Sequence, residues 1–93
     1  MAYELKWTQV AKDNYHEIVS YIYDTLGEVI AERFTDELQS RLSKLEIFPF
    51  VGKQHSTLSS VRQLIIGKHH ILFYTVIDNS VIVLNVLDCK RFI

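Results

Sequence analysis

Two adjacent histidines, His69 and His70, are the residues whose type and spacing most suggest chemistry. An imidazole titrates near neutral pH, so either ring could serve as a general acid or base. Neighbouring residues of a strand point to opposite faces of a sheet, and the pair is therefore poorly placed to bind one metal ion together. The interpretation we favour is structural: one ring contacts Asp88, which lies opposite His69 when the last hairpin is counted from its turn.

The other histidines and the cysteine do not form a recognisable site. His16 and His55 show no metal-ligand spacing with each other or with Cys89, and no nucleophile signature surrounds this single cysteine. A phosphate-binding loop and the G-x-S-x-G and H-E-x-x-H motifs are also absent from the sequence. We therefore expect no metal, no cofactor and no assignable catalytic residue.

The basic residues raise the question of an anion site. Arg62, Lys68, Lys90 and Arg91 lie in or beside the C-terminal strands, whereas most acidic residues lie in the helices. A local anion site near Tyr74 and a set of ordinary solvated cations both agree with this pattern. The net charge of −1, from 10 Lys and Arg against 11 Asp and Glu, is unusual for a free-standing nucleic-acid binder, because phosphate contacts need a basic surplus.

Two helices are predicted in the first half of the chain. Alternation over residues 2–7 indicates a first strand, and Thr8 is a suitable N-cap for the helix that follows. Gly27 ends that helix and Pro49 stops a second one, so the short connection implies an antiparallel helix hairpin. Apolar residues recur every three or four positions in both: Ala11, Tyr15, Ile18, Ile22 and Leu26, then Ile30, Phe34, Leu38, Leu42 and Leu45.

Three β-rich runs follow a polar loop over residues 50–60. They span residues 61–66, 69–77 and 81–88, with turns at Gly67-Lys68 and Asp78-Asn79. Asp and Asn tolerate the left-handed conformation that a tight hairpin turn needs. The predicted order is β-α-α-β-β-β, an α+β fold in which a helix hairpin packs on a small antiparallel sheet. A length of 93 residues fits a single domain, over residues 1–93.

The last hairpin carries apolar side chains on both faces when its turn sets the register. Two helices cover only one face, so we expect the other to bind a partner chain or to be shielded by the first strand, the loop or the tail. One counted face holds Ile71, Phe73, Thr75, Ile82, Leu84 and Val86, and the other holds His70, Leu72, Tyr74, Val76, Val81, Val83, Asn85 and Leu87. We assign partner contacts on the second face to Leu72, Tyr74, Val83, Asn85 and Leu87.

Sequence features that would direct the chain to a membrane or out of the cell are missing. The N-terminal residues lack the apolar segment of a signal peptide, and no apolar run approaches the ~18 residues that a membrane span needs. The single cysteine cannot form an internal disulfide. We therefore expect a cytoplasmic protein without a membrane partner.

Short motifs follow one another along nearly the whole chain: Trp7-x-x-x-Ala11 with Ile18 and Tyr21-Ile22, the helix break at Gly27, Phe48-Pro49-x-x-Gly52-Lys53, Val61-Arg62-x-Leu64, Lys68-His69-His70-Ile71-Leu72-Phe73-Tyr74-x-Val76 and Val81-Ile82-Val83-Leu84-x-Val86-Leu87-Asp88. In this order they resemble the RelE/ParE toxins of bacterial type II toxin–antitoxin systems, a family that includes plasmid stabilisation toxins. The resemblance implies a small antitoxin partner of the ParD or RelB kind, and contact with DNA only through that antitoxin.

The resemblance implies two alternative activities. RelE-like members cleave messenger RNA in the ribosomal A site, whereas ParE-like members poison DNA gyrase and are not known to use catalytic residues. The arginine that the ribonucleases carry in the middle strand corresponds here to Ile71, and their catalytic tail is missing because the sequence stops at Phe92-Ile93. A ribonuclease built on this chain would use Arg62, His70, Tyr74, Lys90 and Arg91.

These departures favour a ParE-like toxin that arrests growth by binding DNA gyrase and that is not an enzyme. A RelE-like ribosome-dependent mRNA endoribonuclease and a non-toxic interaction module of the same fold are the alternatives. Asp88 stands where ParE-like chains often have histidine, which leaves another target open. The face of Ile71 is the active one in RelE-like enzymes, so either the core lies on the Tyr74 side or the functional surface is apolar and suited to protein.

Overall fold

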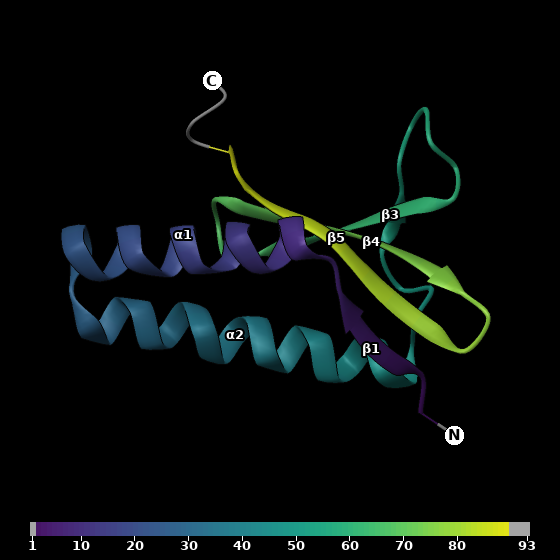
Figure 1. Cartoon of the computed structure of the whole chain (residues 1–93), viewed down its shortest axis with the longest axis horizontal. Coiled ribbons are helices and arrows are strands. Elements are labelled where there is room, and N and C mark those ends of the chain that lie inside the picture. The colour runs from purple at the N-terminus through teal and green to yellow at the C-terminus, as the bar shows by residue number, and fades with distance from the viewer. Residues whose placement is uncertain (1, 90–93) are drawn as a thin grey trace.

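A computed structural model describes residues 2–89 of the chain, with a helix hairpin lying against a mixed sheet (Figure 1). The elements are β1 (Glu4–Trp7), α1 (Gln9–Leu26), α2 (Glu28–Ile47), β2 (Lys53–Gln54), β3 (Val61–Ile66), β4 (His70–Ile77) and β5 (Ser80–Asp88). The predicted α+β fold is confirmed, with one short strand, β2, that the sequence did not indicate. No helix in this range is both long and apolar enough to cross a membrane.

Local capping explains where the two helices begin and end. Thr8 Oγ1 accepts a hydrogen bond from the Ala11 amide at 3.1 Å, as predicted for the N-cap of α1. Gly27 has a φ of 94°, a conformation that residues with side chains rarely adopt, and its N–H donates to the carbonyls of Ile22 and Tyr23. Because Gly27 is also the N-cap of α2, the two helices form a hairpin without a separate loop.

The sheet has the strand order β1-β5-β4-β3-β2. Strands β3, β4 and β5 pair in the predicted antiparallel manner, and β2 pairs with β3 at one edge. At the other edge β1 pairs in parallel with β5, with Leu5 opposite Val81 and Trp7 opposite Val83. A parallel pair needs a crossover connection, which the helix hairpin helps to provide. The sheet is therefore mostly antiparallel, with one parallel pair that the sequence did not indicate.

The β4–β5 hairpin follows the counted register near its turn. Ile77 pairs with Ser80 and Tyr74 pairs with Val83, which is the register that a two-residue turn dictates. Asp78 has a φ of 54°, so the turn uses the left-handed conformation expected of this residue type.

Beyond Tyr74, a β-bulge shifts the pairing by one residue. Phe73 pairs with Asn85, which makes Leu84 the extra residue on β5. Because side chains alternate between faces along a strand, this single insertion reverses the face assignment of every β5 residue that follows it.

The start of α1 stabilises the bulged part of β5. The Thr8 hydroxyl lies 2.9 Å from the Leu84 carbonyl oxygen and 3.1 Å from that of Val83, and the Thr8 amide also donates to the latter. Further along, Asn14 Oδ1 accepts a hydrogen bond from the Val86 amide at 3.1 Å. These contacts give partners to backbone groups that would otherwise lose them where β1 ends.

The core lies between the helix hairpin and the face of the sheet that carries Tyr74. This arrangement answers the question that the sequence left open, because Ile71 belongs to the opposite face. The sheet contributes Ile66, Leu72, Tyr74, Val81, Val83 and Val86 to the buried cluster, and the helices contribute Ala11, Ile18, Ile22, Ala31, Phe34, Leu38, Leu42 and Leu45.

Candidate partner-binding face

The face of β3, β4 and β5 that points away from the helices is called the open face below. The strand pairing assigns to it Val61, Gln63 and Ile65 of β3, Ile71, Phe73, Thr75 and Ile77 of β4, and Ser80, Ile82, Leu84, Asn85 and Leu87 of β5. None of these residues is charged, although 23% of the chain is Asp, Glu, Lys or Arg. In the described sheet, the charged residues at positions on this same side lie on the edge strands, at Lys53, Glu4 and Lys6.

The apolar residues of the open face are accessible to solvent. Ile65 is 59% exposed and Ile77 is 53% exposed. Ile71, Phe73 and Leu87 are partly buried by their neighbours. A contiguous apolar surface of this kind is typical of an interaction site rather than of a free monomer surface.

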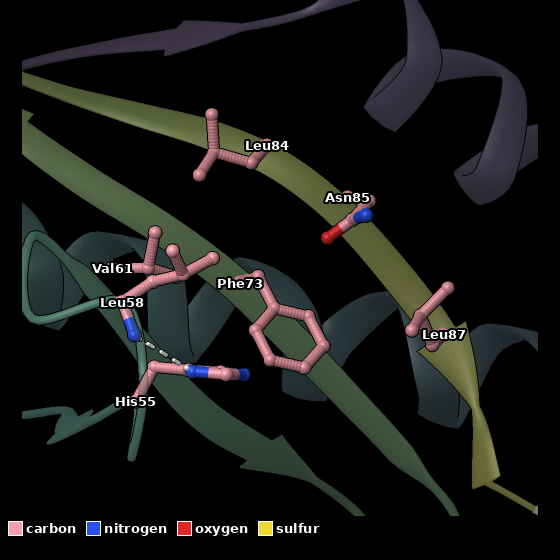
Figure 2. Close-up of a pocket in the computed structure, with 7 residues that line it drawn as sticks. All are labelled: His55, Leu58, Val61, Phe73, Leu84, Asn85 and Leu87. Carbon is pink, nitrogen blue, oxygen red and sulfur yellow. Dashed lines mark hydrogen bonds between the residues drawn. The ribbon is translucent and has the colours of Figure 1, made fainter.

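A shallow groove of about 280 Å³ lies on the open face between β4, β5 and the loop that precedes β3 (Figure 2). Its floor is formed by the side chains of Phe73 and Leu87, and the loop contributes His55 and Leu58 at its border. Asn85 brings an amide to the groove from β5. The groove therefore combines an apolar floor with an imidazole and an amide.

The conformation of the loop orients His55. Its Nδ1 accepts hydrogen bonds from the backbone amides of Thr57 and Leu58, both at 3.2 Å, and lies 3.1 Å from the Thr57 hydroxyl. The ring is tilted over Phe73, with 6.2 Å between the two ring centroids. No role was predicted for His55, because nothing in its spacing reveals that the loop folds back onto the sheet.

On the helix-facing side, Tyr74 and Arg62 hold the loop that follows α2. The Tyr74 hydroxyl accepts a hydrogen bond from the Gly52 amide at 2.8 Å. Burial raises the pKa of Tyr74, while the Gly52 hydrogen bond and the Arg62 charge act in the opposite direction. Arg62 donates to the carbonyls of Phe50 at 3.1 Å and Gly52 at 2.8 Å, and its guanidinium lies 5.3 Å from the centre of the Phe50 ring.

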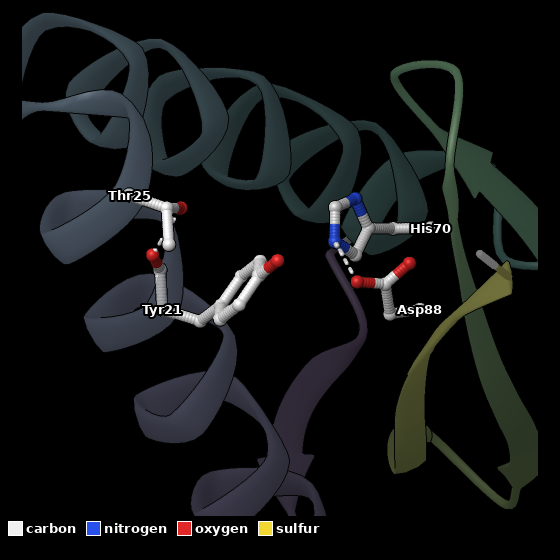
Figure 3. Close-up of polar contacts among 4 residues, drawn as sticks. All are labelled: Tyr21, Thr25, His70 and Asp88. Atoms are coloured by element: carbon white, nitrogen blue, oxygen red, sulfur yellow. Dashed lines mark hydrogen bonds and ion pairs between the residues drawn. The ribbon is translucent and has the colours of Figure 1, made fainter. Parts of the chain in front are cut away.

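His70, and not His69, lies opposite Asp88, because the bulge shifts the pairing by one residue. The counted register was therefore wrong by one position, whereas the predicted contact of one of the two rings with Asp88 is confirmed. His70 Nε2 is 3.9 Å from Asp88 Oδ2, and the His70 ring packs on Phe34 with 4.7 Å between centroids. Figure 3 shows the Tyr21 ring directed toward this pair from α1. No three His, Cys, Asp or Glu side chains within residues 2–89 are grouped so that they could hold a metal ion.

The residues predicted for a ribonuclease do not converge on an accessible surface in the described part of the chain. Tyr74 is fully buried, Arg62 is bound to loop carbonyls, and His70 lies beside Asp88. The strand pairing places all three on the side of the sheet that faces the helices, away from the open face. The other two candidates, Lys90 and Arg91, lie outside the described residues.

The residues predicted for partner contact divide between the two faces. Leu72, Tyr74 and Val83 are each 0% exposed beneath the helices, so their assignment to an exposed surface is corrected. Asn85 and Leu87 line the groove of the open face. The bulge causes the division, because it separates residues that a simple count puts on one face.

A second exposed apolar segment follows α2. Ile47, Phe48, Phe50 and Val51 are between 58% and 65% exposed, on either side of the buried Pro49. From the sequence, Pro49 was expected to stop α2 and residues 50–60 to form a polar loop, and no exposed apolar surface was predicted here. Four large apolar residues around one proline could have indicated an exposed surface, because a loop cannot bury them all.

Known proteins resemble this chain in sequence profile and in fold. The sequence profile described as "ParE toxin of type II toxin-antitoxin system, parDE" matches residues 5–91. The fold is similar to that of a chain in the chromosomal ParDE system of P. aeruginosa, with a TM-score of 0.78, 17% identity, and coverage of 94% of this chain and 96% of that one. No curated protein sequence matches the chain.

Two further solved structures share the fold. One is a chain of the RelBE2 toxin–antitoxin complex of Mycobacterium tuberculosis, with a TM-score of 0.66, 18% identity, and coverage of 95% of this chain and 99% of that one. The other is the YoeB dimer of Staphylococcus aureus, with a TM-score of 0.65, 18% identity, and coverage of 91% and 94%. At these identities the likeness concerns the fold alone.

Proposed function

This chain belongs to the ParE toxin family of type II toxin–antitoxin systems, and from that premise we propose that it arrests growth by binding a protein target, DNA gyrase. In this proposal the chain acts in the cytoplasm and is not an enzyme. A cognate antitoxin of the ParD or RelB kind neutralises it by covering the open face. The chain contacts DNA only through that antitoxin.

The observation that carries the proposal is the lack of charge on the open face. Binding of RNA or DNA depends on Lys and Arg side chains that neutralise phosphates. The outward positions of β3, β4 and β5 have no such side chain, and the exposed groups there are mainly Ile, Leu, Phe and Val. The centre of a protein–protein interface is depleted in charged residues and enriched in aromatic and apolar ones, which is the composition found here.

The same surface gives little support to RNA cleavage. Phosphodiester cleavage needs a positioned proton donor or acceptor and a positive group beside the reacting phosphate. Tyr74 is buried and hydrogen-bonded to Gly52, and Arg62 is used to hold the loop. Ile71 occupies the middle of the sheet where the RelE-like resemblance calls for arginine.

A two-part assay tests the proposal. The chain is first expressed in a bacterium with and without the short reading frame adjacent to its gene, and growth is followed. Purified chain is then added to a gyrase supercoiling reaction and, separately, to a translating extract in which messenger RNA cleavage is measured. We expect growth arrest that the adjacent frame relieves, loss of supercoiling and intact messenger RNA.

Matched variants connect the result to the open face. Ile65→Lys adds a charge to the open face at a site that is 59% exposed, and Val10→Lys adds one to α1 at a site that is 57% exposed. Ile65→Lys should weaken partner binding while Val10→Lys should leave it unchanged. Messenger RNA cleavage with normal supercoiling would replace the proposal with a ribonuclease. An absence of growth arrest would indicate a non-toxic interaction module.

A further inference from the structure

We propose that the groove on the open face binds an uncharged, apolar segment of a partner polypeptide, and that His55 anchors it by donating an Nε2–H hydrogen bond to a backbone carbonyl of that segment. The inference deepens the proposed function, because it rests on the open face being the partner surface and names the chemistry of what binds there. His55 acts here as a binding residue and takes no part in catalysis.

The loop fixes the position of the proton on the His55 ring. Nδ1 faces the backbone amides of Thr57 and Leu58, and both can only donate. A ring nitrogen that accepts must present its lone pair, so the neutral ring carries its proton on Nε2. The loop therefore fixes one tautomer and leaves a single N–H donor at the far side of the ring.

The Nε2–H donor of His55 lies at the groove. Figure 2 shows the second ring nitrogen of His55 on the side away from Leu58, next to the Phe73 ring that lines the groove. The groove floor there is apolar, so a hydrogen bond formed above it is shielded from water and gains strength. Asn85, on β5, supplies the other polar group at this groove.

The size and the lining of the groove limit what it can bind. Sites for small molecules have volumes of roughly 300–1,000 Å³ and bury most of their ligand, whereas this groove of about 280 Å³ is shallow and lies at the lower limit of that range. A volume of this size accommodates one or two apolar side chains. Charged side chains would be desolvated against Phe73 and Leu87 without a counter-charge on β3, β4 or β5, which is unfavourable. A neutral polypeptide segment with a leucine-like or valine-like side chain satisfies these conditions.

The experiment is a selection of random peptides displayed on phage against the purified chain. Peptides that also bind the Phe73→Glu variant are removed, so that only binders of the groove remain. We expect the enriched peptides to share an uncharged apolar core. The best peptide is then synthesised, and its Kd is measured by calorimetry for the wild type and three variants.

The variants separate the anchoring role of His55 from its structural role. In His55→Asn, the Asn Oδ1 can accept from the amides of Thr57 and Leu58, so the loop is retained but the Nε2–H donor is lost. We expect its Kd to rise about fivefold to tenfold while its Tm stays close to that of the wild type. His55→Ala should lose both affinity and loop order. The matched control, His69→Asn, alters an exposed histidine outside the groove and should bind as the wild type does.

A direct readout keeps the proposal testable if His55→Asn does not fold. In wild-type protein with isotope-labelled histidine, the Nε2–H resonance of His55 should shift and exchange more slowly with water when the peptide binds. Unchanged Nε2–H behaviour, unchanged affinity of a folded His55→Asn variant, or enrichment of charged peptides would each overturn the proposal. A failed gyrase assay beside a positive peptide result would reject the proposed target and retain the chemistry of the groove.

Discussion

The helix-covered face and the open face of β4 and β5 are made from alternate residues of the same two strands, and both are mainly apolar. They differ in their neighbours. The first is sealed by α1 and α2, so that Leu72, Tyr74 and Val83 are completely buried. Among residues 2–89, the second is bordered by the loop with His55 and Leu58 and is not covered by a helix. Apolar composition therefore does not distinguish the core face from the exposed face in this protein, whereas the position of the helices does.

The bulge at Leu84 decides which residues of β5 belong to each face. Without it, Leu87 would join the core and Val86 would lie on the open face. Thr8 and Asn14 make hydrogen bonds with the bulged segment from a position more than seventy residues earlier in the chain. Substitutions that act on one face only are the most informative way to test this division.

The largest expected difference in the free energy of unfolding is between variants at two leucines. Counting the register from the hairpin turn puts both leucines on one face of the sheet. Leu72→Ala empties a fully buried site and should lower the free energy of unfolding by about 2–5 kcal/mol. Leu87→Ala removes a partly exposed side chain of the open face and should cost about 1 kcal/mol or less. Urea unfolding of the two variants measures the difference. Equal losses would mean that the bulge is misplaced.

A smaller effect is expected at the loop that follows α2. A Cβ atom added to Gly52 would lie 2.5 Å from the Tyr74 hydroxyl oxygen and 2.9 Å from the Gln63 carbonyl oxygen. Gly52→Ala should therefore lower the free energy of unfolding by about 1–3 kcal/mol through overpacking. Val51→Ala, at the exposed neighbouring position, is the control and should change it little. A wild-type melting temperature for Gly52→Ala would contradict the close packing of this loop on Tyr74.

The smallest effect concerns the Tyr74 hydroxyl and depends on pH. Tyr74→Phe removes the hydrogen bond from the Gly52 amide and should cost about 1 kcal/mol at neutral pH. Burial raises the pKa of Tyr74 above its ordinary value of 10.0, so the folded state holds this proton more tightly than the unfolded state does. The contribution is fully present below pH 10 and is lost as the pH rises toward the folded-state pKa.

Unfolding experiments at neutral and alkaline pH test the direction of this change in stability with pH. The wild type should lose stability above pH 10 more steeply than Tyr74→Phe, which has no phenol to ionise. The stability difference between the two proteins should therefore shrink as the pH increases. A difference that stays constant or grows with pH would show that the Tyr74 phenol is not held in its neutral form.

Some features of the site could be predicted from the sequence and others could not. Asn85 and Leu87 were assigned to a partner surface and do line the open groove. The register count that led to them also put core residues of β4 and β5 on that surface. Phe73 and Leu84 were assigned to the other face, and His55 was given no role. Each of these depends on where β5 shifts register or on where a loop folds back, and neither event leaves a periodic signal in the chain.

Properties that depend on neighbouring residues were determined by the sequence itself. The N-cap at Thr8, the helix break at Gly27 and the tight turn at Asp78 follow from local hydrogen bonds and from φ preferences. The element order apart from β2 and the presence of two apolar faces follow from patterns of the same short range, and the family resemblance follows from the order of short motifs along the chain. Only the tertiary structure decided which face became the core, because that choice depends on hydrogen bonds that Thr8 donates to β5 and Asn14 accepts from it, and on helices that could have covered either side.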